Sequence, residues 1–446
     1  MDLTKPPQTS DLPAYKLPPV YETTLANGLT VLLVEDRRFP LVTARLGFYA
    51  GSKFDPQELA GLSESAAALL TEGTTNRSAR QIAEEAASIG GSLHGDSSQD
   101  SLVLAGNALA ENLPRFLNLM ADVARNANFV EDEVELRKQN RKQELEAQRS
   151  DASFLADEKF AEVLFSPHPY ARREPTPESI DRLSRDTLAS FRDRHLAPNN
   201  AVLVLLGAIP ARERALGLIE TEFGSWRQTQ TPAAPPAQFP APKGGITLVD
   251  RPGSVQADLR IGRLAVTRSE PDYFPLLVGN TILGGGTSSR IFMNIREKKG
   301  YAYDARSSLQ PLKDSGVFAV VTQVRNEVLS AAFEAIFDEM KQISSTPVSA
   351  GELETAKNYL SGVFVIRLET QDGLASQLAA TKLMGLPLDY LEKYTARIRA
   401  VKPDEIRAAA SKYVAPDQDS IVVVGDASKI GRQLEEFGKV AVEEAK

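Results

Sequence analysis

The chain contains no cysteine and only three histidines among its 446 residues. The absence of cysteine excludes disulfide bridges, thiolate metal sites and a cysteine nucleophile, although it leaves the cellular compartment open. The histidines His94, His168 and His195 are far apart in the sequence, and none has a partner at the spacing of metal ligands. We therefore expect each of them to be a structural or solvated residue.

Long apolar runs are missing as well. No stretch of the chain has the roughly 20 consecutive apolar residues that cross a bilayer, and the N-terminus lacks a basic region followed by an apolar one. The sequence therefore predicts no membrane segment. A formal net charge of −8 and the lack of a dense Lys/Arg stripe also argue against a nucleic-acid partner, because phosphate binding depends on clustered basic charge.

The length of the chain predicts two domains, because a single hydrophobic core rarely serves more than about 250–300 residues. Residues 1–20 are rich in proline and polar side chains and predict an extended arm, and residues 228–245 have the composition of a linker. These stretches delimit an N-terminal domain, residues 21–227, and a C-terminal domain, residues 246–446. Such an arm is common after a removed signal peptide, so we favour a periplasmic location, with a cytoplasmic location as the alternative.

The two parts of the chain repeat one another at a constant offset. The segment P-N-N-A-V-L-V-L-L-G, residues 198–207, resembles P-D-Q-D-S-I-V-V-V-G, residues 416–425, and the two segments are 218 residues apart. An offset of this size indicates a duplicated domain rather than a solenoid repeat.

Each half mixes hairpin-linked strands with long amphipathic helices and does not alternate strictly between them. In the first half we expect a hairpin around Asn27-Gly28, further strands at residues 42–49, 92–106 and 198–208, and helices at residues 80–89, 114–127 and 131–149. The sequence therefore predicts an α+β fold with two homologous domains, each a largely antiparallel sheet covered by helices.

A further expected helix, within A-G-L-S-E-S-A-A-A-L-L-T-E-G-T at residues 60–74, carries the main functional clue. Its apolar residues recur at steps of three and four, and Gly73 lies where a C-terminal cap is expected. The stretch resembles the zinc-binding helix of the pitrilysin and mitochondrial-processing-peptidase family, A-G-L-x-H-x-x-E-H-x-L-x-x-G-T. In this register the first histidine falls on Glu64, the glutamate on Ala67 and the second histidine on Ala68.

The resemblance implies that the metal chemistry of this helix is missing. In that family both histidines bind zinc, and the glutamate takes a proton from the zinc-bound water. The family's third ligand, a glutamate on a later helix, is matched by Glu144. One carboxylate does not hold zinc, and Glu64 with Glu144 lacks the further ligands that a harder cation needs. We therefore expect no bound metal, no cofactor and no catalytic residue in this chain.

The second half contains another segment that resembles this family, L-G-G-G-T-S-S-R-I-F-M-N-I-R-E-K-K-G-Y-A-Y, residues 283–303. The family has here a helix ending in R-E-x-x-G-L-A-Y, whose arginine and final tyrosine contact the backbone of the bound peptide. These residues correspond to Arg296 and Tyr303. We expect Gly300 to end the helix and a strand to follow, so that the two side chains converge. The resemblance covers nearly the whole chain from about Tyr21, and it implies two related halves clamped around a cleft.

Two classes of function are compatible with these features. In the first, the chain is the zinc-free subunit of a heterodimeric metalloendopeptidase: a homologous subunit supplies the zinc, while this chain supplies Arg296, Tyr303 and half of the chamber. In the second, it is a structural or peptide-binding relative without a proteolytic role. The intact Arg/Tyr pair favours the first class. An active enzyme that uses a different metal has little support.

Overall fold

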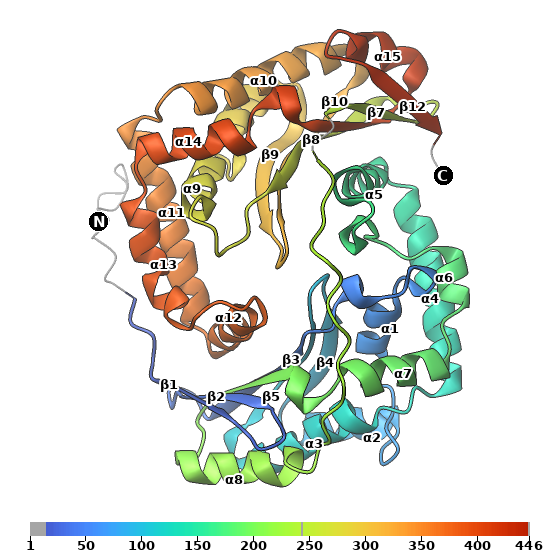
Figure 1. Cartoon of the computed structure of the whole chain (residues 1–446), viewed down its shortest axis with the longest axis vertical. Coiled ribbons are helices and arrows are strands. Elements are labelled where there is room, and N and C mark those ends of the chain that lie inside the picture. Colours follow the sequence, from blue (N-terminus) through green and yellow to red (C-terminus); the bar gives the residue numbers. More distant parts are fainter. Residues whose placement is uncertain (1–14, 242–243, 445–446) are drawn as a thin grey trace.

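The computed structural model describes residues 15–241 and 244–444, which form two six-stranded sheets with helices on both faces (Figure 1). The strands are β1 (Val20–Thr24), β2 (Thr30–Glu35), β3 (Leu41–Phe48), β4 (Ser92–Ser97), β5 (Leu102–Leu109), β6 (Ala201–Gly207), β7 (Gly245–Asp250), β8 (Gln256–Ala265), β9 (Ala302–Pro311), β10 (Gly316–Arg325), β11 (Ser420–Gly425) and β12 (Val440–Glu444).

The helices of the first half are α1 (Leu62–Leu69), α2 (Ala79–Ser88), α3 (Leu113–Asn126), α4 (Glu131–Arg149), α5 (Ala152–Phe165), α6 (Pro177–Asp181), α7 (Arg185–His195) and α8 (Arg212–Phe223). Those of the second half are α9 (Tyr273–Gly284), α10 (Leu329–Ser345), α11 (Ala350–Leu368), α12 (Gln371–Leu383), α13 (Asp389–Ala400), α14 (Pro403–Tyr413) and α15 (Ala427–Glu435). Residues 1–14 of the expected arm and residues 242–243 of the expected linker lie outside the described residues.

The two sheets have the same topology. The first has the strand order β1-β2-β6-β3-β5-β4 and the second the order β12-β7-β11-β8-β10-β9, so that five strands of each sheet correspond one to one. The pairs β2/β6 and β7/β11 are parallel, whereas the other shared pairs are antiparallel. This confirms the predicted α+β fold of two homologous, mostly antiparallel domains.

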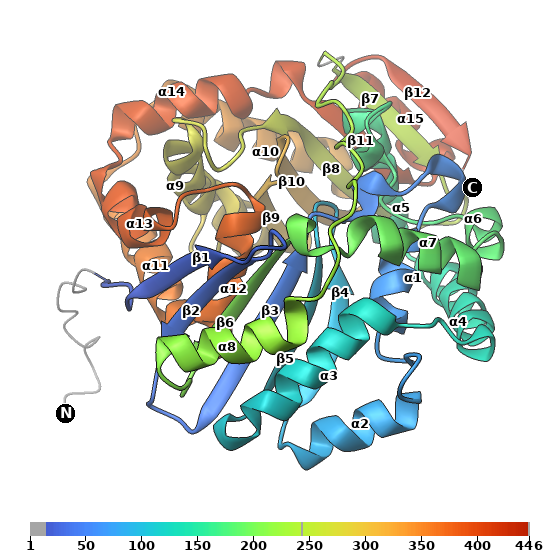
Figure 2. The same ribbon diagram turned by 60° about the horizontal axis from the view of Figure 1, so that its bottom comes forward.

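The central strands explain the apolar runs in the sequence. All residues of β6 and β11 are buried, because helices cover both faces of each sheet. On the outer side of the first sheet, α3 and α8 lie next to each other (Figure 2). The inner side is covered by the opposite half: α12 packs on β3 and β6, and α5 packs on β8 and β11. Each half therefore contributes one helix to the core of the other.

Two arginines at equivalent positions fasten these exchanged helices. Arg45 on β3 and Arg260 on β8 occupy the same register in the duplicated sheets, and both are buried. Arg45 donates to Asp372 of α12, and Arg260 donates to Asp157 of α5 at 2.6 Å. Each ion pair thus joins a strand of one half to a helix of the other.

A buried lysine joins the two halves at the tips of their hairpins. The side chain of Lys53 is only 2% exposed, and its Nζ lies 2.9 Å from Asp100 Oδ1 and 2.8 Å from Asp314 Oδ2. Asp100 lies in the β4–β5 hairpin and Asp314 in the β9–β10 hairpin. The hydroxyl of Tyr170 donates a hydrogen bond to Asp100. The halves therefore meet through a compact buried polar cluster as well as through the exchanged helices.

One local prediction is wrong. The helix ends at Leu69 with Leu70 as its cap, so Gly73 does not cap it. Gly73 lies in the following turn with a φ of +137°, where it bridges Ser78. The hydroxyl of Thr74 accepts hydrogen bonds from two backbone N–H groups of that turn and so holds the chain in a non-helical conformation.

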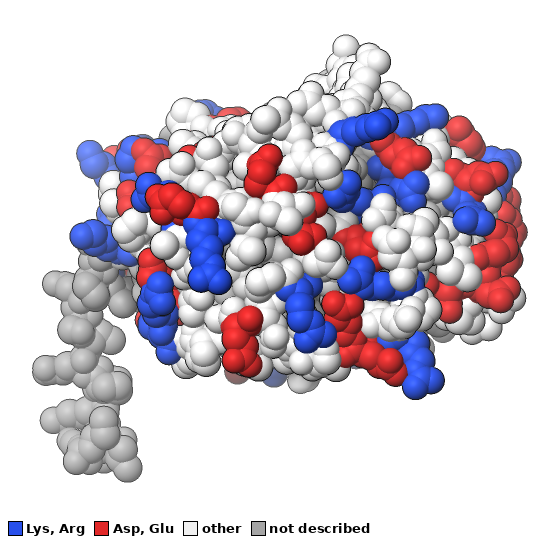
Figure 3. All heavy atoms as spheres, turned by 90° about the horizontal axis from the view of Figure 1, so that it is seen from below, with Lys and Arg blue, Asp and Glu red and all other residues white. Residues whose placement is uncertain are grey.

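The surface agrees with the charge pattern of the sequence. Seen from below, basic and acidic side chains are interspersed, and no stripe of basic residues crosses this face (Figure 3). Among the helices of residues 15–241 and 244–444, none is long and apolar enough to cross a bilayer.

Candidate functional site

The helix that resembles the zinc-binding helix starts at a buried carboxylate. Asp55 accepts hydrogen bonds from the backbone N–H of Gly61 at 3.2 Å, and from the N–H and the hydroxyl of Ser63, each at 3.1 Å. Gly61 has a φ of +90°, which glycine adopts without strain. Burial raises the pKa of Asp55 to about 7. These contacts fix the start of α1 and hence the position of Glu64 in its first turn.

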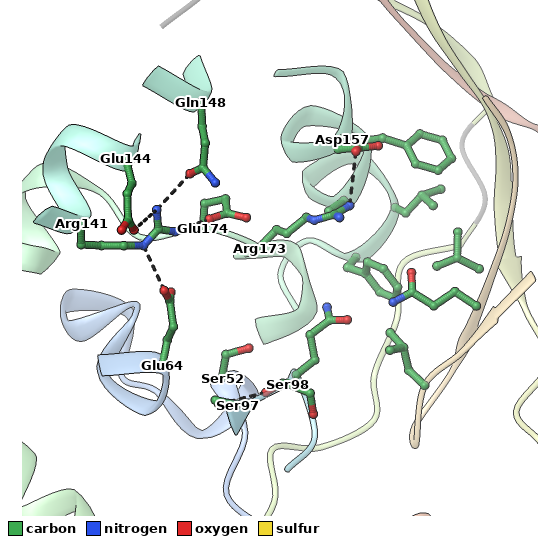
Figure 4. A pocket seen from close by; sticks show the side chains of 18 residues that line it. Ser52, Glu64, Ser97, Ser98, Arg141, Glu144, Gln148, Asp157, Arg173 and Glu174 are labelled. Atoms are coloured by element: carbon green, nitrogen blue, oxygen red, sulfur yellow. Dashed lines mark hydrogen bonds and ion pairs between the residues drawn. The ribbon is translucent and has the colours of Figure 1, made fainter. Parts of the chain in front are cut away.

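Two arginines of α4, Arg137 and Arg141, lie where the resemblance places a metal ion. Figure 4 shows Arg141 between Glu64, Glu144 and Gln148. Glu64 Oε1 accepts a hydrogen bond from Arg137 Nη2 at 2.7 Å and lies 3.1 Å from Arg141 Nε. Arg141 also donates to Glu174 at 2.6 Å and to Gln148 at 2.9 Å. Burial raises the pKa of Glu174, whereas the Arg141 guanidinium acts to lower it. The site is therefore a network of ion pairs centred on a buried guanidinium.

Glu144, the match to the family's third ligand, faces the same network. Its Oε2 lies 3.7 Å from Arg137 Nη1 and 4.0 Å from Arg141 Nη1, so its contacts with both arginines are long. The structure thus brings Glu64 and Glu144 to one place, as the family register implies. The guanidinium groups of Arg137 and Arg141 lie between the two carboxylates.

These residues do not fit a zinc ion. Ala67 and Ala68 offer no donor atom, and Ala67 is packed so closely against β4 that a Cβ on Gly95 would lie 2.2 Å from its carbonyl oxygen. A dication would also have to displace Arg141, whose side chain is 6% exposed. Among the residues that the structure describes, no group of three or more His, Asp or Glu side chains could hold a metal ion.

A pocket of about 530 Å³ opens beside this ion-pair network. One side consists of the network residues, and Asp157 and Arg173 lie on another side, 3.8 Å apart (Figure 4). An apolar wall comes from α5 and from the β9–β10 hairpin, and uncharged polar side chains, among them Ser52, Ser97 and Ser98, complete the lining. Because the pocket is lined from both halves of the chain, it lies in the cleft between them.

The side chains of Arg296 and Tyr303, the second expected site, lie in contact with each other. The guanidinium carbon of Arg296 lies 4.6 Å from the centre of the Tyr303 ring, in a cation–π contact, and 5.0 Å from the ring of Phe292. The segment Phe292–Lys298 is a π-helix, a feature often found at functional sites. Gly300 ends it with a φ of +63°, and β9 begins two residues later. Arg296 and Tyr303 therefore converge from a helix end and a strand start.

A bulge in β9 turns Tyr303 outward. Ala305 pairs with Thr322, but Ala302 pairs with Val324, so β9 has one extra residue between these pairs. In a regular strand Tyr303 would share the face of Ala305, which is fully buried. Tyr303 is instead 84% exposed, which leaves its hydroxyl free to meet a ligand.

The three histidines take the structural or solvated positions that were expected. His94 is exposed on β4. His168 is buried, and its Nδ1 accepts a hydrogen bond from Tyr170 N at 3.1 Å. His195 is buried between Phe191 and Phe54, and burial lowers its pKa to about 4. None of them belongs to either site described above.

Sequence reasoning missed the residues that replace the metal. Arg137 and Arg141 are four residues apart and precede Glu144 on the same face of α4, a spacing that is visible in the sequence. Their partners Glu64 and Glu174 lie on other elements, so the spacing alone could not identify the network.

Two models of one protein family match most of the chain. Residues 30–174 match the family model described as insulinase, peptidase family M16, and residues 182–360 match the model described as peptidase M16 inactive domain. The chain belongs to the M16 peptidase family. This confirms the resemblance to pitrilysin and the mitochondrial processing peptidases, and the missing H-x-x-E-H motif makes the chain a non-catalytic member.

Relatives and solved structures of this M16 protein cover most of its length. It is 27% identical to an uncharacterized zinc protease of Mycobacterium leprae over 93% of this chain and 94% of the relative. It is 25% identical to an uncharacterized zinc protease of Streptomyces coelicolor over 91% of this chain and 89% of the relative. The crystal structure of a peptidase M16 inactive domain from Pseudomonas fluorescens superposes with a TM-score of 0.85, at 27% identity, over 91% of this chain and 98% of that one. A protease from Helicobacter pylori, 21% identical, shares the fold with a TM-score of 0.83 over 92% of this chain and 100% of that one.

Proposed function

We propose that this M16 chain is the zinc-free subunit of a heterodimeric metalloendopeptidase. A homologous subunit with an intact H-x-x-E-H motif supplies the zinc and the general base. This chain supplies Arg296, Tyr303 and half of the chamber in which an unfolded peptide is cleaved. A periplasmic location, with a cytoplasmic one as the alternative, remains part of this proposal.

The observation that carries the proposal is the contrast between the two sites. At the degenerate zinc site both histidine ligands and the general base are missing, and Arg137 and Arg141 lie between Glu64 and Glu144. At the second site Arg296 and Tyr303 form a contact pair, and a bulge presents Tyr303 to solvent. A subunit without any role toward peptides has no need to expose such a pair.

Arg296 and Tyr303 suit the recognition of a peptide backbone. A guanidinium donates to carbonyl oxygens in a fixed fork, and a phenol can donate or accept one directed hydrogen bond. The Tyr303 ring lies against the Arg296 guanidinium and so limits its motion, which reduces the entropy lost on binding. In the heterodimer the pair orients the peptide, while the partner's zinc polarises the scissile carbonyl.

Co-expression with the zinc-bearing homologue from the same genome tests this function. We expect the two chains to elute as one complex in size-exclusion chromatography and to cleave an unstructured peptide in a chelator-sensitive reaction. Each chain alone should show little or no cleavage, and elemental analysis should find zinc only with the partner.

The controls separate the two classes of function. Inactivating the partner's zinc motif should abolish cleavage without affecting assembly. If the homologue is fully active alone and does not bind this chain, the heterodimer proposal is wrong, and the structural or peptide-binding alternative takes its place.

A further inference from the structure

The pocket beside the ion-pair network has a surface that the proposed role of Arg296 and Tyr303 does not explain. The charges of its floor are already paired, because Arg141 forms ion pairs with both Glu64 and Glu174. Its apolar wall consists of Phe160, Ala161, Leu164, Phe165, Leu312 and Val317. Gln99 and Gln310 also line the pocket, and neither side chain forms a hydrogen bond within the described part of the chain. The apolar wall and these amides are therefore available to a ligand.

The position of the pocket indicates what kind of ligand it takes. Strand β9 is the last strand of the second sheet, and no described strand pairs with its outer edge. An unpaired edge offers backbone N–H and C=O groups to an extended peptide. The strand begins beside Tyr303, and Gln310, near its other end, lines the pocket. At about 3.3 Å per residue, the seven steps between these two residues span about 23 Å.

We propose that this pocket anchors a bulky apolar side chain of an extended peptide, about seven residues from the segment held by Arg296 and Tyr303. This subsite rests on the proposed function and narrows its substrates. They are unfolded peptides that carry an aromatic or large aliphatic residue about seven residues from the segment held by Arg296 and Tyr303. An acidic side chain is disfavoured, because its carboxylate would lose its hydration against the apolar wall.

Photo-crosslinking to the purified full-length chain tests the pocket directly. The probe is an unstructured ten-residue peptide of Gly, Ser and Ala that carries one p-benzoyl-phenylalanine, whose bulky apolar side chain reacts with nearby C–H bonds. Mass spectrometry should locate the crosslinks in residues 160–165 and 310–317. The same peptide with Phe should compete about ten- to hundredfold better than the peptide with Ala, because burial of an aromatic ring adds that much affinity. The peptide with Asp should not compete better than the Ala peptide.

Two substitutions block the pocket in different ways. Ala161→Phe fills it from α5, and Gln310→Trp fills it from an exposed position on β9, so the second still carries the test if the first perturbs folding. Each should reduce crosslinking at least fivefold with an unchanged thermal unfolding curve. Gln342→Trp, the same change at an exposed position of α10, is the matched control and should leave the yield unchanged.

Crosslinks scattered over the surface, an unchanged yield in the folded Gln310→Trp variant, or equal competition by the Asp and Phe peptides would each overturn the inference. The assay needs neither the zinc-bearing partner nor cleavage. A failed assembly therefore refutes the proposed function alone, and an active heterodimer without crosslinks in this pocket refutes the subsite alone.

Discussion

Removal of Arg141 is the sharpest test of the network that replaces the metal. Arg141→Met keeps most of the side-chain volume but leaves Glu174 without its guanidinium partner, while Glu64 keeps Arg137. Breaking a fully buried pair costs about 3–5 kcal/mol. Since the side chain of Glu174 is 18% exposed, we expect a loss of about 2–4 kcal/mol in the free energy of unfolding at pH 7.5.

The pH dependence of this loss follows from the pKa of Glu174. Burial already raises the pKa of this carboxyl, and the loss of Arg141 raises it further. A carboxyl whose pKa is higher in the folded than in the unfolded state destabilises the protein above the folded pKa, and the penalty disappears as the pH falls below the unfolded value. The difference between Arg141→Met and the parent chain should therefore shrink from pH 7.5 to pH 5.

Urea denaturation of both chains at the two pH values measures this effect. Lys142→Met is the matched control, since Lys142 is the next residue of α4 and pairs only at the surface, with Asp181. It should change the free energy of unfolding by about 0.5 kcal/mol or less at either pH. The reasoning is refuted if Arg141→Met behaves like this control, or if its destabilisation grows as the pH falls.

Three further changes test other parts of the structure. In the reconstituted heterodimer, Arg296→Ala and Tyr303→Phe should each lower kcat/KM by tenfold to several hundredfold, about 1.5–4 kcal/mol, with assembly intact by size exclusion; full activity of both would contradict their assignment. Lys53→Met should lower the free energy of unfolding by about 3–5 kcal/mol in urea, because it leaves two carboxylates facing each other; a loss below about 1 kcal/mol argues against the cluster as a tie between the halves. The parent chain should lose about 2–3 kcal/mol of stability as the pH falls from 6.5 toward 4, because His195 takes up a proton in the unfolded state but not when buried in the folded state. His195→Phe should remove this loss. Equal acid sensitivity of variant and parent in thermal unfolding would show that His195 does not cause it.

The features that the sequence predicted well depend on local pattern or on the family register. Strand and helix positions follow from periodicity, and the convergence of Arg296 and Tyr303 follows from the family motif and from Gly300 between them. The outward turn of Tyr303 could not be predicted, because the bulge that causes it depends on how β9 pairs with β10, a neighbour that is distant in sequence at that point.

The replacement of the metal by arginines shows where sequence reasoning stops. Substitution of the histidines by Glu64 and Ala68 reveals that zinc is lost, but not what takes its place. Arg137 is 73 residues from Glu64, and only the packing of α4 against α1 brings them together. A charge on a helix face is usually solvated, so its burial in a network is visible only in the structure.

The exchanged helices also bear on how a peptide could enter the chamber. Local sequence pattern does not show that α5 and α12 each cover the sheet of the opposite half, because both helices contact sheets that are distant in sequence. Opening the chain between its halves would uncover β6 and β11, whose residues are all buried, and would break both pairs of Arg45 and Arg260. Exposure of that much apolar surface is costly at about 25 cal/mol per Å². A chain whose halves are held together in this way is compatible with the proposed heterodimer, in which the chamber opens between two subunits.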